Sequence, residues 1–223
     1  MKRALVFLCL LGAVVGFLVL PKLVFGAPLD LKLGFNQKIF YYHVPAAMIM
    51  FASVFVSGIA SIAYLKTRDA RWDDVAVVAA GLVVLFGALV LTSGPVWGKA
   101  AWRHYWVWDA RLIQALLLWM MFIGYGLLRR YGGLGADRFS AGLAIFGMVD
   151  VPLVYFAVNF WKTQHPNNSV VPSLQGGMRT AFWSGVLAYV CLYVVLFAAS
   201  LAVTRGRRRL EASEVLARDL TRG

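Results

Sequence analysis

Residues Val75–Ser93 read VAVVAAGLVVLFGALVLTS, a run without a single charged side chain. A helix needs roughly 20 predominantly apolar residues to cross the hydrocarbon core of a bilayer, and this run has about that length. A helix is also the simplest structure that satisfies every backbone N–H and C=O group inside lipid. The run therefore predicts a transmembrane helix, and runs of this kind decide the fold class of the chain.

Similar apolar runs recur along the 223-residue chain, in which 61% of the residues are hydrophobic and the mean hydropathy is +0.73. This composition excludes a soluble domain, which could not bury so much apolar surface. The six predicted spans are Ala4–Phe25, Val44–Leu65, Val75–Ser93, Leu112–Leu128, Ala141–Phe160 and Ala181–Val203. We expect an all-α integral membrane protein, with one bundle of six transmembrane helices over residues 1–204 and a basic tail over 205–223.

The first predicted span follows Met-Lys-Arg, so this part of the chain also resembles a signal peptide. Its apolar stretch is longer than a typical signal core, and Pro21 and Lys22 come late in it. We therefore favour a retained transmembrane helix. The two cysteines, Cys9 and Cys191, lie in apolar runs far apart in the sequence, and we interpret them as small buried hydrophobic residues.

The formal net charge is +12, and the basic residues gather between and beyond the apolar runs. Fourteen of the 22 lysines and arginines lie at the N-terminus, in the second and fourth connections and in the tail. Such a bias sets the orientation of a membrane protein, so we expect both termini in the cytoplasm and no nucleic-acid role. The cytoplasmic connections hold no phosphate-binding loop, and we do not expect an enzyme.

In this orientation, the stretch Trp97–Leu112, WGKAAWRHYWVWDARL, faces the outside. It concentrates four tryptophans in one connection, whereas an ordinary interfacial belt has one or two rings at each helix end. If the stretch is helical, Trp102, Trp106 and Asp109 share one stripe and Tyr105 lies beside Trp108 on the next. Such a helix would lie along the interface as an aromatic shelf for a large flat ligand. A plain belt stays open as the alternative, with Trp97 as the ring best suited to it.

The three histidines all lie in or at the edge of outward-facing connections. His43, in YYHVPAA, precedes Pro45, which suits the first turn of a helix and places His43 at the outer mouth of the second span. His165, in KTQHPNNS, precedes another proline and is therefore predicted in a loop. A histidine at an interface is usually a hydrogen-bonded polar residue. Two at equal depth beside a tryptophan shelf instead suggest axial ligands of haem iron.

Haem also carries two propionates, which arginine and lysine can bind. The outward-facing candidates are Lys38, Arg111 and Arg179, and each could equally be an anchor to lipid headgroups. We assign Asp109 to the start of the fourth span, where an acid favours the helix dipole. Asp150 lies inside the fifth span, where an ionisable residue can be functional or can have a local structural role.

The tryptophan-rich stretch resembles the WWD signature of bacterial haem-handling proteins, WGxxxWGxxWxWDxRLT. YHVPAA and WKTQHPNNS resemble the two histidine segments of one such family, cytochrome c maturation protein C (CcmC). The matching residues are Trp97, Gly98, Trp102, Trp106, Trp108, Asp109, Arg111 and Leu112. The departures are Arg103 for glycine, Tyr105 for tryptophan, Ile113 for threonine and Lys38 for arginine. They keep aromaticity and charge. His104 is outside the pattern.

The resemblance implies that haem b is held by His43 and His165 at the periplasmic face of the bacterial inner membrane, against the tryptophan platform. It further implies transfer to a periplasmic haem chaperone (CcmE), with an ABC transporter pair (CcmA and CcmB) and a small membrane protein (CcmD) as partners. Two alternatives remain. An electron-transfer b-type cytochrome subunit would want histidines inside the spans. A transporter would want broken helices and buried charges, of which Asp150 is the one hint.

Overall fold

The computed structural model describes residues 3–31, 33–161, 163, 165 and 170–220. Its helices are α1 (Arg3–Gly26), the 3-10 helix η1 (Phe35–Ile39), α2 (Phe40–Thr67), α3 (Ala70–Trp102), α4 (Ala110–Tyr131), α5 (Ala136–Phe160), α6 (Val170–Ser173) and α7 (Gly176–Leu220). Within this described part, six helices are long and apolar enough to cross a membrane, and they contain the six predicted spans. The predicted all-α fold of six spans is confirmed.

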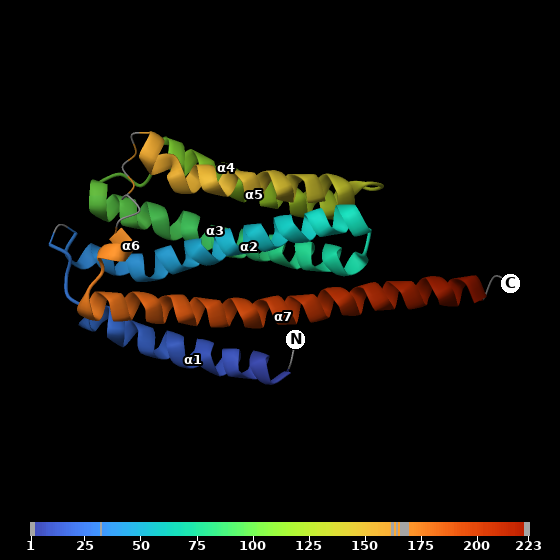
Figure 1. Ribbon diagram of the computed structural model, residues 1–223, viewed down its shortest axis with the longest axis horizontal. Helices are drawn as coiled ribbons and strands as arrows, with labels where there is room; N and C mark the ends of the chain where they lie inside the picture. Colours follow the sequence, from blue (N-terminus) through green and yellow to red (C-terminus); the bar gives the residue numbers. More distant parts are fainter. Residues whose placement is uncertain (1–2, 32, 162, 164, 166–169, 221–223) are drawn as a thin grey trace.

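The helices run roughly parallel or antiparallel to one another in the bundle (Figure 1). The α2–α3 pair packs at its centre, α4 and α5 pack together on one side, and α1 packs against α7 on the other. The N-terminal end of α1 and the C-terminal end of α7 point the same way, and α7 extends beyond the other helices (Figure 1). The α3–α4 and α5–α7 connections, which hold His104 and His165, and the start of α2, which holds His43, therefore lie at the opposite end.

Small residues bring the helices close together, as is typical of helix packing in membranes. Gly16 of α1 faces Ala188 of α7, and Gly87 of α3 faces the indole of Trp119 on α4. The indole N–H of Trp119 donates to the carbonyl of Val84, 2.9 Å away, so the ring is fixed in place against α3.

Gly87→Ala is expected to lower the free energy of unfolding by about 1–3 kcal/mol, because overpacking a tight contact forces side chains or backbone to move. An added methyl group would collide with Cδ1 of Trp119. Gly81→Ala, on the same helix, is the matched control, because its methyl group would meet nothing within 4 Å. Thermal unfolding of both variants in one detergent measures the difference. Equal melting temperatures would show that the α3–α4 contact can accommodate the added methyl group without loss of stability.

Ion pairs join three helices at the end where the termini lie. Asp73, near the start of α3, lies 2.6 Å from Arg129 of α4 and 3.0 Å from Arg208 of α7. Asp74 lies 2.8 Å from Arg208 and 3.8 Å from Arg205. The basic segment predicted as a tail is thus, up to Leu220, a continuation of α7, and its first turns are paired with α3.

The prediction of an interfacial helix through the tryptophans is wrong. Helix α3 continues past the predicted Ser93 to Trp102, then ends at Arg103, whose φ of 66° is left-handed. The Arg103 N–H donates to the Lys99 carbonyl at 3.1 Å, which closes the last turn. The next helix starts only at Ala110, so the chain between the two is an irregular connection that reverses direction.

Candidate ligand-binding site

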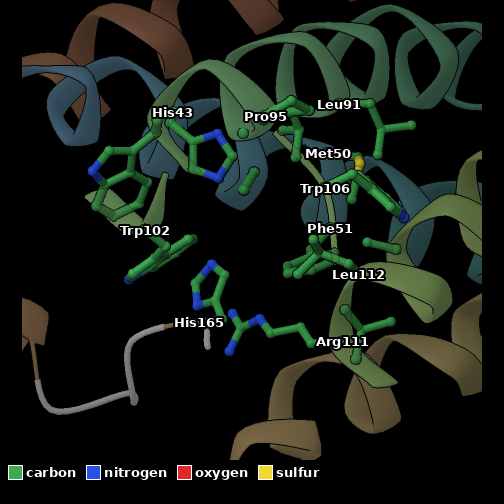
Figure 2. Close-up of a pocket in the computed structure, with 16 residues that line it drawn as sticks. His43, Met50, Phe51, Leu91, Pro95, Trp102, Trp106, Arg111, Leu112 and His165 are labelled. Carbon is green, nitrogen blue, oxygen red and sulfur yellow. The ribbon is translucent and has the colours of Figure 1, made fainter. Parts of the chain in front are cut away.

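A cavity lies at the connection end of the bundle (Figure 2). It encloses about 90 Å³. Its aromatic and polar walls are His43, Trp97, Trp102, Trp106, Arg111 and His165. Its apolar walls include Met50, Phe51, Leu91 and Val154. Residues from α2, α3, α4, α5 and two irregular connections thus meet here. All six residues of the aromatic and polar walls were predicted site residues.

His43 is held in the first turn of α2 by a hydrogen bond to α3. Its Nδ1 lies 2.8 Å from the hydroxyl oxygen of Ser93. That hydroxyl donates to the Leu89 carbonyl at 2.6 Å, so its oxygen is left to accept the Nδ1–H of His43. The tautomer that this network favours leaves Nε2 unprotonated, with the lone pair that a metal requires. Gly94 leaves room for the ring, since a Cβ there would lie 3.3 Å from its Cε1.

His165 is held from the other side by a chain of hydrogen bonds. Its backbone N–H donates to the Thr163 hydroxyl at 3.0 Å, and that hydroxyl donates to Asp109 Oδ2 at 2.7 Å. Asp109 Oδ1 accepts the backbone N–H of Leu112 at 3.0 Å, so Asp109 is the N-cap of α4. The predicted helix-start role of Asp109 is confirmed. Its second role, as a link between the tryptophan connection and the His165 connection, was not predicted.

Trp97 is at the centre of the aromatic cluster. Its ring centroid lies 5.8 Å from that of His43 and 6.4 Å from that of His165, edge-on to the latter. The ring centroid of Trp102 lies 6.1 Å from that of Trp97. Since Trp97 is only 4% exposed, the expectation that it is the ring most suited to an interfacial belt is wrong. In Figure 2 the rings of His43 and His165 lie near Trp102, with the Arg111 guanidinium beside His165.

Three buried donors around the cavity have no hydrogen-bond partner among the described residues: the indole N–H groups of Trp97 and Trp106, and Nη1 of Arg111. Buried polar atoms are normally paired, so unpaired donors in a cavity favour a ligand that brings acceptors. A carboxylate is the acceptor that a guanidinium matches best. The site therefore fits an aromatic ligand that carries acid groups.

A second cavity, of about 270 Å³, lies against the same wall. It shares Trp97, Arg111 and His165 with the first and is otherwise lined by residues such as Val44, Met48 and Tyr155. Ligand pockets commonly have about 300–1,000 Å³, so the first cavity alone is too small for a macrocycle. The two cavities together reach the lower end of that range, and His165 lines both.

Other predicted residues lie outside these cavities. Trp108 is 76% exposed, and its ring meets that of Trp106 edge to face, with the two ring centroids 5.8 Å apart. The Tyr105 ring is 62% exposed, with the Lys99 ammonium 5.2 Å from its centroid. The buried Lys38 donates to the Ala27 carbonyl at 2.6 Å and so fastens the α1–α2 connection. Arg179 and His104 are exposed. Among the predicted cations, Arg111 is the one that lines the cavities.

Sequence reasoning missed Ser93 and Thr163. The first was assigned to the end of an apolar span, and the second falls in a connection whose course no periodicity predicts. A signal existed for Thr163, because it stands two residues before His165, a spacing at which a hydroxyl can accept the following backbone N–H.

These features define a multi-pass membrane protein with an aromatic site, containing two histidines and one arginine, at one end of its bundle. The family model described as heme exporter protein C matches residues 1–220. The chain belongs to this family, CcmC, whose members handle haem in cytochrome c biogenesis. The suspected resemblance is thereby confirmed.

Individual relatives agree. The chain is 34% identical over 199 residues to heme exporter protein C of Bradyrhizobium diazoefficiens, across 85% of this chain and 74% of that protein. It is 30% identical over 204 residues to heme exporter protein C of Escherichia coli K12, across 85% and 80%. A cytochrome c biosynthesis ccmC-like mitochondrial protein of Marchantia polymorpha is 35% identical over 144 residues, across 65% of this chain and 61% of that protein.

Proposed function

We propose that this chain holds haem b at the outer face of a bacterial inner membrane and passes it to a periplasmic haem chaperone of the CcmE type. The observation that carries the proposal is the meeting of His43, His165 and Trp97 around one cavity, although the three are far apart in sequence. Haem is the cargo here. Its iron takes two axial imidazoles, and its propionates supply the acceptors that the unpaired donors lack.

Each residue then has a distinct task. His43 offers Nε2 from a rigid helix, with its tautomer set by Ser93. His165 offers its ring from outside the helices, with its backbone held by Thr163. Arg111 pairs with a propionate, and the indoles pack on the macrocycle.

The proposed partners come from the family resemblance. They are the ABC transporter subunits CcmA and CcmB and the small membrane protein CcmD. Both termini of this chain would lie in the cytoplasm. The rival functions find less support. His43 lies in the first turn of α2, at the end of the span instead of its middle. The helices with internal prolines, at Pro21, Pro45, Pro95 and Pro152, continue through them unbroken, unlike the broken helices of many transporters.

Trp106→Ala and Trp108→Ala test the two halves of the proposal separately. Trp106 lines the cavity, so its loss is expected to lower the haem retained by the purified protein by about twofold to tenfold. Trp108 is exposed, so its loss is expected to leave retained haem unchanged and to slow transfer to the chaperone. Haem absorbance measures retention, and covalent haem on added CcmE measures transfer. Normal values of both in the two variants would reduce these rings to an ordinary belt.

Ser93→Ala tests the assigned tautomer. It removes the acceptor of the His43 Nδ1–H and is expected to weaken haem binding by about 10- to 100-fold, as is typical when the hydrogen-bond partner of a metal ligand is lost. Ser93→Thr keeps a hydroxyl and serves as the control. Haem titration followed by absorbance gives both affinities. Equal affinity of the alanine variant and the wild type would contradict the role of Ser93.

A further inference from the structure

Two concave regions meet at Arg205 of α7, at the end of the bundle opposite the haem site. One is a groove of about 650 Å³ between α1 and α7. The other is a pocket of about 520 Å³ beside the start of α3. Arg205 lines both regions, so the two adjoin at this side chain. Neither region shares a residue with the cavities of the proposed haem site, so a ligand bound here would not compete with haem for the same side chains.

The groove is apolar apart from the two arginines that line it. Phe7 and Leu10 of α1 and a stretch of α7 from Val195 to Ala202 provide its walls, and Arg3 and Arg205 are its charged residues. At roughly 1.5 Å per residue, the α7 wall from Val195 to Arg205 is about 15 Å long. That is half of the roughly 30 Å hydrocarbon core, which is the depth of one leaflet. The groove therefore has the length and polarity of a site for an acyl chain whose headgroup lies at Arg205.

The pocket has the opposite character. Its charged walls are Arg71, Arg205, Arg208 and Arg209 against a single carboxylate, Asp74. Asp74 is already engaged by Arg205 and Arg208. Arg71 and Arg209 have no ion pair within the described part of the chain, so positive charge is in excess here. Basic pockets between transmembrane helices suit acidic lipid headgroups.

We propose that an anionic phospholipid of the cytoplasmic leaflet binds across these two regions. Its phosphate would lie in the arginine pocket and an acyl chain along the α1–α7 groove. A ligand with both parts satisfies both regions at once. A zwitterionic lipid would bring an ammonium group next to the same arginines, and a soluble phosphate would leave the groove empty. The lipid would join α1 and α7 to the start of α3, which Arg208 also contacts.

Native mass spectrometry of the full-length chain in mild detergent tests the proposal. The probes are dioleoylphosphatidylglycerol, dioleoylphosphatidylcholine with the same acyl chains, and inorganic phosphate. We expect the wild type to retain about tenfold more phosphatidylglycerol than phosphatidylcholine. Arg71→Gln/Arg209→Gln is expected to reduce that retention about tenfold. Ala202→Phe, which fills the groove without changing charge, is expected to reduce it as well.

The matched control is Arg130→Gln/Arg138→Gln, which removes two arginines at the same end of the bundle but outside both regions. This control is expected to retain lipid like the wild type. Equal retention of the two lipids, or an equal loss in the control, would overturn the proposal. A third result would also overturn it: inorganic phosphate binds to the wild type but not to Arg71→Gln/Arg209→Gln, and Ala202→Phe retains lipid normally. The pocket would then be a site for soluble anions.

Discussion

His43→Ala and His165→Ala are each expected to abolish the absorption bands of six-coordinate haem in the purified protein, and the double variant is expected to lose bound haem altogether. Both rings line the same cavity and pack against Trp97, so the two imidazoles that haem iron would bind are brought together there. Removal of either imidazole leaves the iron with at most one protein ligand.

Two further variants make this result specific. His104→Ala removes an exposed histidine of the tryptophan connection that lines neither cavity, and it is expected to leave the spectrum unchanged. His43→Met replaces one ligand by a thioether and is expected to shift the bands instead of abolishing them. Circular dichroism checks that each variant is folded. A wild-type spectrum in both alanine variants would refute axial ligation by these histidines.

The spans could be predicted from the sequence because unpaired backbone groups are costly in lipid. A long apolar run in a membrane protein therefore almost always forms a helix. The ends of the helices were less predictable. The apolar run ends at Ser93, but α3 continues through Pro95 to Trp102, because extending an existing helix costs less than starting a new one. This extension turned the expected interfacial shelf into a cluster around the end of α3.

Parts of the site were predictable for a different reason. His43, His165 and Arg111 stand out because charged and imidazole side chains are rare near a membrane core. The contacts that hold them are not visible in the sequence, because they join residues far apart in the chain. Ser93 contacts His43 across 50 positions, and Thr163 contacts Asp109 across 54. Lys38 is the opposite case, a residue that the sequence suggested for the site but the structure uses elsewhere. Its ammonium group donates to the Ala27 backbone carbonyl and does not line the cavity.

The second large effect is expected at Asp109, whose two carboxylate oxygens have separate tasks. Oδ1 caps α4, and Oδ2 accepts from Thr163, whose hydroxyl in turn accepts the backbone N–H of His165. Asp109→Ala loses both contacts. We expect it to weaken haem binding by about 10- to 100-fold through the loss of His165 positioning, and to destabilise α4 by about 1 kcal/mol through the loss of its cap.

Asp109→Ser separates the two tasks, because serine is a good N-cap residue but is too short to cap α4 and hold Thr163 at once. It is expected to keep the thermal stability of the wild type and still lose haem affinity, measured by haem titration. Thr163→Val breaks the same link from the other side and should have a similar effect on affinity, and the Asp109→Ser/Thr163→Val double variant should be no worse than the single ones. Additive losses in that double variant would mean that Asp109 and Thr163 act on haem by independent routes, and that the hydrogen-bonded chain does not position His165.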